Sequence, residues 1–180
     1  MRLWRLLLCL GLAAALAPAA DKLSNRRAPG FALPDLNLKY HDLADYHGRV
    51  VLIEFMKTNC PHCPGLSRKL EEIKAKYGLK VAILSVVTPP DNQQSVLRYI
   101  QTNFLTTPVL FDCGQMAASY LKVGPQNPTV DLPHLFVIDG QGTIRHDYNF
   151  ETDRQILEGK ALFDAVERLV AGQPAPAKPR

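Results

Sequence analysis

Residues 50–63 read VVLIEFMKTNCPHC, and this stretch decides the fold of the chain. Its first six residues, Val50–Phe55, form an apolar run interrupted only by Glu54, which is typical of a strand buried at the centre of a sheet. Two cysteines separated by two residues follow, and we expect a helix to begin at about Cys60. The N-terminus of a helix stabilises a thiolate. The stretch therefore predicts a dithiol redox site.

Strands and helices alternate along the rest of the chain. We expect strands at residues 31–36, 81–87, 108–111, 134–138 and 143–148, and helices at residues 60–77, 94–101, 115–121 and 154–171. This order predicts an α/β fold with a central mixed sheet and helices on both of its faces. It is also the order of the thioredoxin fold, to which the strand at residues 31–36 would add an N-terminal β extension.

The first nineteen residues have the pattern of a secretory signal peptide. Arg2 and Arg5 precede an apolar run that ends at Leu16, and residues 17–19 are small or proline. The run is shorter than the ~20 residues that a membrane-spanning helix needs, so we expect cleavage rather than a retained anchor. The sequence thus predicts an exported protein, periplasmic or otherwise extracytoplasmic, which would be attached to a membrane only if residues 1–19 remained uncleaved.

The remainder of the chain divides into three segments. Residues 20–27 are polar and are expected to be flexible. Residues 28–171 are predicted to form one thioredoxin-like domain, because the roughly 160 residues that remain after cleavage suit a single core. Residues 172–180 contain three prolines and are expected to be a disordered tail.

Charge and cysteine content narrow the classes of function. The formal net charge of +4 falls to +2 when residues 1–19 are removed, because Arg2 and Arg5 leave with them, and no basic stripe points to nucleic acid. The three remaining cysteines, Cys60, Cys63 and Cys113, are too few for a disulfide-stapled scaffold in an oxidising compartment. Cys113 is interpreted as a partly buried free thiol, with a third redox cysteine or an intermolecular link as the alternatives.

Three more stretches carry a family resemblance. Residues 28–36 read APGFALPDL, residues 43–52 read LADYHGRVVL, and residues 132–139 read LPHLFVID. Together with the C-x-x-C motif they resemble thioredoxin-like proteins of the TlpA/ResA type, within the redoxin group, over residues 28–170. The resemblance implies a monomeric thiol-disulfide oxidoreductase with no cofactor besides its redox-active disulfide. Its partners would be protein thiols and disulfides in the cell envelope and an upstream redox protein.

The two cysteines of the motif are expected to have different roles. Cys60 is the expected nucleophile, and Cys63, one helical turn later, would resolve the mixed disulfide. Pro61 suits a first helical turn, where its missing N–H is not needed. An inert structural disulfide is the alternative, but a bridge that closes so short a loop would contribute little stability.

His62 is the expected tuning residue. An imidazole near Cys60 favours the thiolate, and a stabilised thiolate makes the disulfide a stronger oxidant. Cys-Pro-His-Cys is also the active-site sequence of the oxidant DsbA, whose reduction potential is about −120 mV, against about −270 mV for thioredoxin. The TlpA/ResA type is more often associated with reduction, so the direction of electron flow stays open. The alternative is an exposed loop histidine without electronic effect.

Glu54 lies six residues before Cys60 on the predicted buried strand. Burial disfavours the charged carboxylate, so its pKa should rise. The resemblance to thioredoxin implies that Glu54 accepts a proton from Cys63. The alternatives are a side chain that points to solvent, or one that pairs with Lys57 or another lysine.

The segment at residues 132–134 would supply the substrate-binding loop. The resemblance implies a cis peptide bond before Pro133 and a substrate chain that pairs with the backbone of Leu132. His134 would lie near the site, or be a strand-entry side chain. The family usually has an aromatic residue and a tryptophan where this chain has Asn59 and Met56, which predicts a more polar surface around the dithiol.

Two other functions are considered. A copper-binding or metal-delivery protein could use Cys60, Cys63 and His134 as soft ligands for Cu(I). A peroxidase of the redoxin group would need a threonine three residues before Cys60, where Lys57 stands, with Thr58 one place late.

Overall fold

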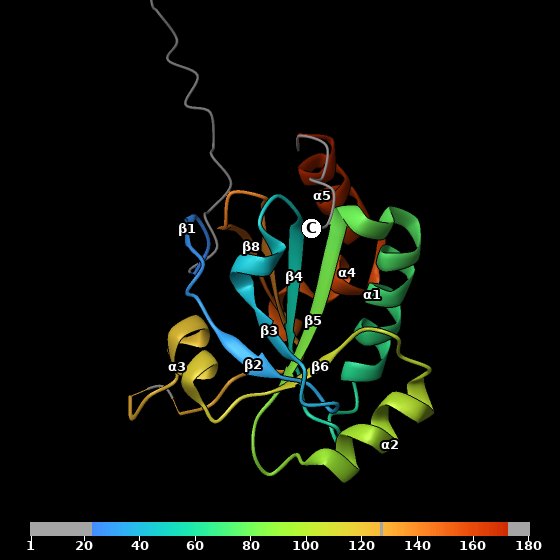
Figure 1. Ribbon diagram of the computed structural model, residues 1–180. Helices are drawn as coiled ribbons and strands as arrows, with labels where there is room; N and C mark the ends of the chain where they lie inside the picture. The colour runs from blue at the N-terminus through green and yellow to red at the C-terminus, as the bar shows by residue number, and fades with distance from the viewer. Residues whose placement is uncertain (1–22, 127, 173–180) are drawn as a thin grey trace, which may run out of the picture.

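The computed structural model describes residues 23–126 and 128–172. Six strands form a mixed sheet in the order β1-β8-β7-β4-β5-β6 (Figure 1). These strands are β1 Arg26–Arg27, β4 Val50–Phe55, β5 Val81–Val87, β6 Val109–Phe111, β7 His134–Ile138 and β8 Thr143–Asn149. A separate two-stranded sheet consists of β2 Ala32–Pro34 and β3 Tyr40–Asp42.

Helices cover both faces of the large sheet, which confirms the predicted α/β architecture (Figure 1). One face is covered by α1, α4 and α5, and the other by α3, η1 and the β2–β3 hairpin, while α2 packs near the end of β4. The bounds of the helices are η1 Leu43–Tyr46, α1 Cys63–Tyr77, η2 Gly78–Lys80, α2 Gln93–Asn103, α3 Gln115–Leu121, α4 Phe150–Glu158 and α5 Lys160–Ala171.

Strand β4 lies at the centre and explains the long apolar run. It pairs in parallel with β5 and antiparallel with β7, and all six of its residues are buried. Val51, Ile53 and Phe55 face the core under α3, whereas Val50 and Leu52 face the core under α1 and α5. A strand with a core on each side needs apolar residues at every position, so its sequence shows no alternation.

The expectation of a flexible segment at residues 20–27 is wrong for its last part. Arg26 and Arg27 form β1, which pairs with Ile144 and Thr143 of β8. The Arg26 guanidinium also donates to the Tyr120 carbonyl oxygen at 2.7 Å. Backbone pairing with a strand far along the chain leaves no mark on local polarity, so the sequence did not reveal it. Residues 1–22 and 173–180, with the predicted signal peptide and most of the tail, lie outside the described residues.

The single helix expected at residues 154–171 is wrong: α4 and α5 meet at Gly159. The predicted apolar stripe is nevertheless buried, with Leu157, Leu162 and Val166 in one core. Because helical spacing continues through the junction, periodicity alone concealed the break. A Cβ atom at Gly159 would overlap the carbonyl oxygen of Gln155, so this sharp junction needs glycine.

Within the described ranges, no helix is both long enough and apolar enough to cross a membrane.

We predict that Gly159→Ala lowers the free energy of unfolding by about 1–3 kcal/mol, because the new methyl group forces the α4–α5 junction apart. Gly65→Ala is the matched control, since Gly65 lies in α1 with open space around its Cα. Alanine there should stabilise by ~0.5–1 kcal/mol. Denaturant unfolding of the oxidised proteins, followed by circular dichroism, measures both. Equal stability of Gly159→Ala and the unmodified protein would contradict the clash.

Candidate active site

Cys60 and Cys63 form a disulfide just beyond the carboxyl end of β4. Their Cα atoms are 5.5 Å apart. Cys63 is fully buried, whereas Cys60 is half-buried and therefore the sulfur that a partner can reach. The geometry thus separates an accessible from an inaccessible sulfur within one redox pair.

The predicted start of the helix at Cys60 is wrong. Helix α1 begins at Cys63, His62 is its N-cap, and Pro64 rather than Pro61 occupies the first turn. Cys60 nevertheless lies against the end of the helix, because its Sγ accepts a hydrogen bond from the Cys63 backbone N–H at 3.2 Å. The electrostatic benefit expected for a Cys60 thiolate therefore remains. The apolar spacing inside α1 does not define its first residue, so Pro61 and Pro64 were equally suitable for the first turn of the helix.

The loop before β7 faces the reactive sulfur. The Leu132–Pro133 peptide bond is cis, as expected. Cys60 Sγ lies 3.7 Å from the carbonyl oxygen of Leu132. The main chain of Leu132 is therefore directly beside the sulfur that a partner would attack.

The two departures from the family pattern lie in different environments. Asn59 is exposed on the rim of the site, as is Pro61. Met56 is only 2% exposed and belongs to the apolar cluster that contains Cys63. The expectation that Met56 makes the surface more polar is wrong, and Asn59 alone has that effect.

Glu54 is completely buried in a polar network that joins four elements. Its carboxylate accepts hydrogen bonds from Ser85 Oγ on β5 at 2.7 Å and from Ser67 Oγ on α1 at 3.0 Å. Ser67 Oγ also lies 3.0 Å from the Tyr99 hydroxyl on α2. Glu54 therefore neither reaches solvent nor pairs with Lys57, and both alternatives are excluded.

Burial raises the pKa of Glu54 to about 7, although the hydrogen bonds from Ser85 and Ser67 act in the opposite direction. The same desolvation, together with the nearby Glu54, raises the pKa of Tyr99. Ser67 lies four residues after Cys63, and so on the same face of α1. The carboxyl group is thus placed on the sheet side of the helix, one turn from the buried sulfur.

The serine partners of Glu54 were missed in the sequence, although one signal existed. Glu54 and Ser85 are the fifth residues of two apolar runs, and the parallel register places them opposite each other. Matching the polar interruptions of neighbouring buried strands would have found this pair. Ser67 and Tyr99 carried no such mark, because both stand in ordinary amphipathic helices.

His134 does not join the thiols. It is 7% exposed, and its Nε2 lies 2.5 Å from Asp147 Oδ1 on β8. It is the strand-entry side chain of the alternative interpretation. Across residues 23–126 and 128–172, no group of three or more His, Cys, Asp and Glu side chains is arranged to hold a metal ion.

Cys113 is a free thiol and is exposed, so the expectation of partial burial is wrong. It follows Asp112, whose carboxylate accepts hydrogen bonds from the backbone of Met116 and Ala117 at the start of α3. Asp112 fixes the turn, and this turn presents Cys113 to solvent.

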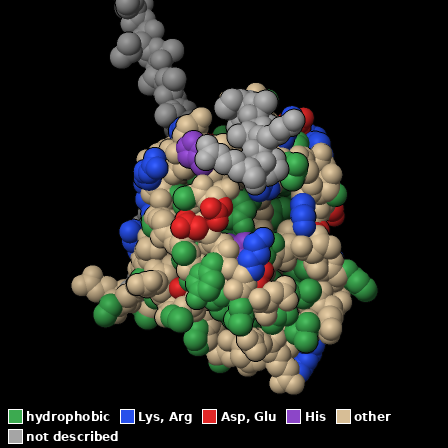
Figure 2. Space-filling model, viewed as in Figure 1, with side chains coloured by type: hydrophobic (Ala, Val, Ile, Leu, Met, Phe, Trp, Pro, Cys, Tyr) green, Lys and Arg blue, Asp and Glu red, His purple; other side chains and the backbone are tan. Residues whose placement is uncertain are grey.

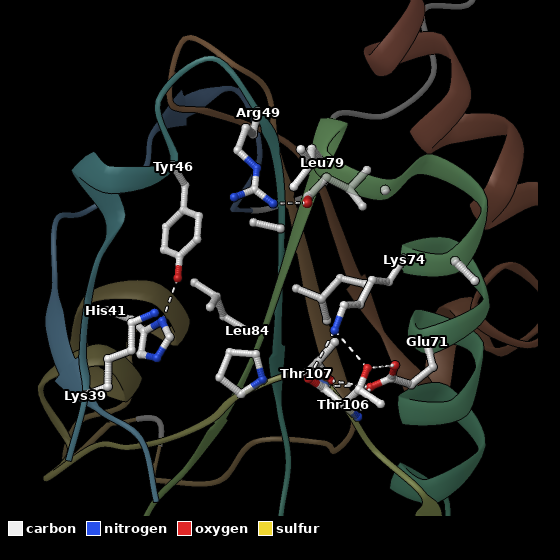
Figure 3. Close-up of a pocket in the computed structure, with 16 residues that line it drawn as sticks. Lys39, His41, Tyr46, Arg49, Glu71, Lys74, Leu79, Leu84, Thr106 and Thr107 are labelled. Carbon is white, nitrogen blue, oxygen red and sulfur yellow. Dashed lines mark hydrogen bonds between the residues drawn. The ribbon is translucent and has the colours of Figure 1, made fainter. Parts of the chain in front are cut away.

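A separate cavity of about 570 Å³ lies away from the disulfide, near the amino ends of β4 and β5 (Figure 3). Its charged groups are largely engaged with the protein. Glu71 accepts hydrogen bonds from Thr106 and Thr107, Lys74 donates to Thr106, and Arg49 donates to the Val81 carbonyl oxygen. The contacts of Glu71 and Lys74 join α1 to the segment that enters β6, and the contact of Arg49 joins the start of β4 to the start of β5. We therefore assign them to the scaffold.

Comparison with known proteins agrees with this geometry. Residues 25–147 match the AhpC/TSA family. The chain is 29% identical over 144 residues to the thiol-disulfide oxidoreductase ResA of Geobacillus kaustophilus, covering 78% of this chain and 72% of that protein. It is 26% identical over 141 residues to the thioredoxin-like protein YneN of Bacillus subtilis, covering 77% and 79%.

A solved structure shows the same fold. The thioredoxin domain of a thiol-disulfide oxidoreductase from Bacteroides vulgatus superposes with a TM-score of 0.67 at 22% identity, covering 82% of this chain and 97% of that one. The fold and the C-x-x-C disulfide thus define a thioredoxin-like thiol-disulfide oxidoreductase, as the sequence predicted. The chain belongs to the AhpC/TSA family.

The raised pKa of Glu54 predicts a pH-dependent stability. The folded protein holds a proton on Glu54 up to about pH 7, whereas the ordinary pKa is 4.5. The stabilisation is therefore complete below pH 4.5 and is lost as the pH rises through 7. Relative to Glu54→Gln, the unmodified oxidised protein should lose about 3 kcal/mol of unfolding free energy between pH 4.5 and 8.

Denaturant unfolding at several pH values measures this difference. Glu72→Gln is the control, because Glu72 lies on the exposed side of α1 and pairs with Lys69 at the surface. Parallel pH profiles for the unmodified protein and Glu54→Gln would show that Glu54 does not titrate as described.

Proposed function

We propose that this protein is an exported thiol-disulfide oxidoreductase that exchanges its Cys60–Cys63 disulfide with protein substrates. The observation that carries the proposal is the asymmetry of the pair. Cys60 is accessible and lies beside the Leu132 carbonyl, whereas Cys63 is buried behind it. A partner sulfur can therefore react only at Cys60, and Cys63 acts from inside the protein.

The chemistry conserves atoms and electrons through two exchanges. The Cys60 thiolate attacks a partner disulfide, so a Cys60–partner bond forms and one partner thiolate leaves. Cys63 then loses its proton and attacks Cys60 Sγ, which closes the internal disulfide and releases the second partner thiolate. Two electrons pass to the partner, and in the oxidising direction the same steps run in reverse.

Glu54 is proposed to hold the proton that Cys63 gives up. Its pKa of about 7 lets the carboxyl group accept and release a proton near neutral pH. Ser67 donates to Glu54 from the turn of α1 that follows Cys63. This arrangement supports Glu54 as the proton acceptor for Cys63, since neither side chain is exposed to bulk solvent.

The substrate segment is proposed to lie extended against the cis-proline loop. The main chain of Leu132 would hold it, and Asn59 and Pro61 would contact it from the exposed rim. Partner proteins of this kind carry a disulfide or dithiol that can approach Cys60 on an unfolded or flexible segment.

The direction of electron flow depends on the reduction potential of the pair. A reduction potential of about −120 mV would make the protein a disulfide donor, and a potential of about −270 mV would make it a reductant. Equilibration with glutathione, followed by alkylation of free thiols, measures it. Cys113→Ala removes the exposed third thiol from this measurement.

Export and partners complete the proposal. The pattern at residues 1–19 supports a location outside the cytoplasm, with partners in the cell envelope and an upstream redox protein. Nucleic acid is not among the proposed partners. On the face shown in Figure 2, lysine and arginine side chains are scattered rather than gathered into one stripe.

Neither alternative function gains support from a specific contact. A peroxidase would need a hydroxyl group beside Cys60, but the Thr58 hydroxyl donates to Asp91. A Cu(I) site would need His134 beside the thiols, but its Nε2 is paired with Asp147.

We predict that Cys63→Ser, made in a Cys113→Ala background, accumulates a covalent adduct with oxidised insulin, because the buried residue can no longer resolve the mixed disulfide. Cys60→Ser in the same background should form no adduct, since Cys63 is inaccessible. Non-reducing gel electrophoresis of the reduced proteins after mixing measures both. Equal trapping by the two variants would contradict the assigned roles.

We predict that Glu54→Gln slows insulin reduction by about tenfold or more, because the Cys63 proton loses its acceptor. The rate of the unmodified protein should rise with pH through about 7, and this inflection should vanish in the variant. Glu72→Gln again serves as control. An unchanged rate and pH profile for Glu54→Gln would remove Glu54 from the mechanism.

A further inference from the structure

The His62 side chain is held by one aromatic contact. His62 is exposed, and as N-cap of α1 it makes no side-chain hydrogen bond to the helix. Its ring stacks on Phe150, with centroids 4.4 Å apart and planes inclined by 19°. One face of the imidazole is thus covered by a residue that lies 88 positions later in the chain.

Phe150 is itself firmly placed. It is the first residue of α4, directly after β8, and Asn149 caps this helix by accepting from the Glu151 N–H at 2.8 Å. The Phe150 ring is half-buried against the core beneath α1, α4 and α5. The Arg154 guanidinium, one turn along α4, lies 5.3 Å from the ring centroid. The Phe150 ring is therefore held in place and can restrict the orientation of the His62 imidazole.

We propose that Phe150 is a positioning residue for His62 and, through it, shifts the equilibrium between the disulfide and the dithiol. The inference rests on the proposed exchange function. An exposed imidazole without a partner samples several rotamers. Stacking confines it to one orientation in the hollow that His62 and Phe150 line together with Leu132, whose carbonyl oxygen lies 3.7 Å from Cys60 Sγ. Held on this side of the disulfide, the imidazole would favour the reduced pair. Phe150 lies outside the C-x-x-C motif, so the four-residue sequence alone does not set the redox equilibrium.

The equilibrium that Phe150 would shift is the exchange between the protein disulfide and glutathione, and its atoms and electrons balance. Two glutathione thiols reduce the Cys60–Cys63 disulfide, which yields one glutathione disulfide and the protein dithiol, and two electrons with two protons move to the protein. Any group that stabilises the Cys60 thiolate raises the equilibrium constant for reduction of the disulfide. Loss of the stacking between His62 and Phe150 should therefore lower this equilibrium constant.

The test measures this constant for Phe150→Leu in the Cys113→Ala background, by equilibration with glutathione and alkylation of free thiols. We expect it to fall about two- to tenfold, the range that an aromatic pair contributes to an equilibrium constant. Phe150→Tyr keeps the ring and should retain the original value. Phe163→Leu is the matched control, because Phe163 packs against the same core but contacts Lys69 and Lys76.

A second set of variants asks whether Phe150 acts through His62. In a His62→Gln background, Phe150→Leu should cause no further change. A change that persists there, an unchanged constant in the first background, or a shift toward the dithiol would each overturn the inference. Failure of the unmodified protein to exchange with glutathione or insulin would instead defeat the proposed function.

Discussion

Burial of β4 on both faces is the constraint on which the rest of the structure depends. All six of its residues are buried, and the strand lies between β5 and β7 with helices on both faces of the sheet. The chain that leaves its carboxyl end enters α1 with Cys60 at the rim and Cys63 inside. The difference in accessibility between the two sulfurs follows from this one packing arrangement.

A carboxyl group within this strand would be costly without partners. Glu54 is tolerated because Ser85 and Ser67 donate to it, with Tyr99 behind them. These partners come from β5, α1 and α2, so the network connects the redox helix with the sheet. Fully bonded networks of this kind restrict a core to one arrangement. The same contacts place an ionisable group one helical turn from Cys63.

Most regular elements could be predicted because their signals are local. The strands Val81–Val87 and His134–Ile138 are apolar apart from Ser85 and His134, and α3 lies at the predicted residues. The predictions failed where contacts between residues distant in sequence determine the local structure. Strand β1 exists through its pairing with β8, and the junction at Gly159 follows from steric overlap that apolar spacing does not record.

The sequence by itself determined the α/β fold, the redox pair Cys60–Cys63 and the position of Glu54 on the central strand, because a continuous apolar run and a C-x-x-C motif are local signals. Only the tertiary structure decided which groups surround them. Ser67 and Tyr99 reach Glu54, and Phe150 reaches His62, through helices that are adjacent in space and remote in sequence. Such contacts depend on how the elements pack, and no short stretch of sequence encodes that.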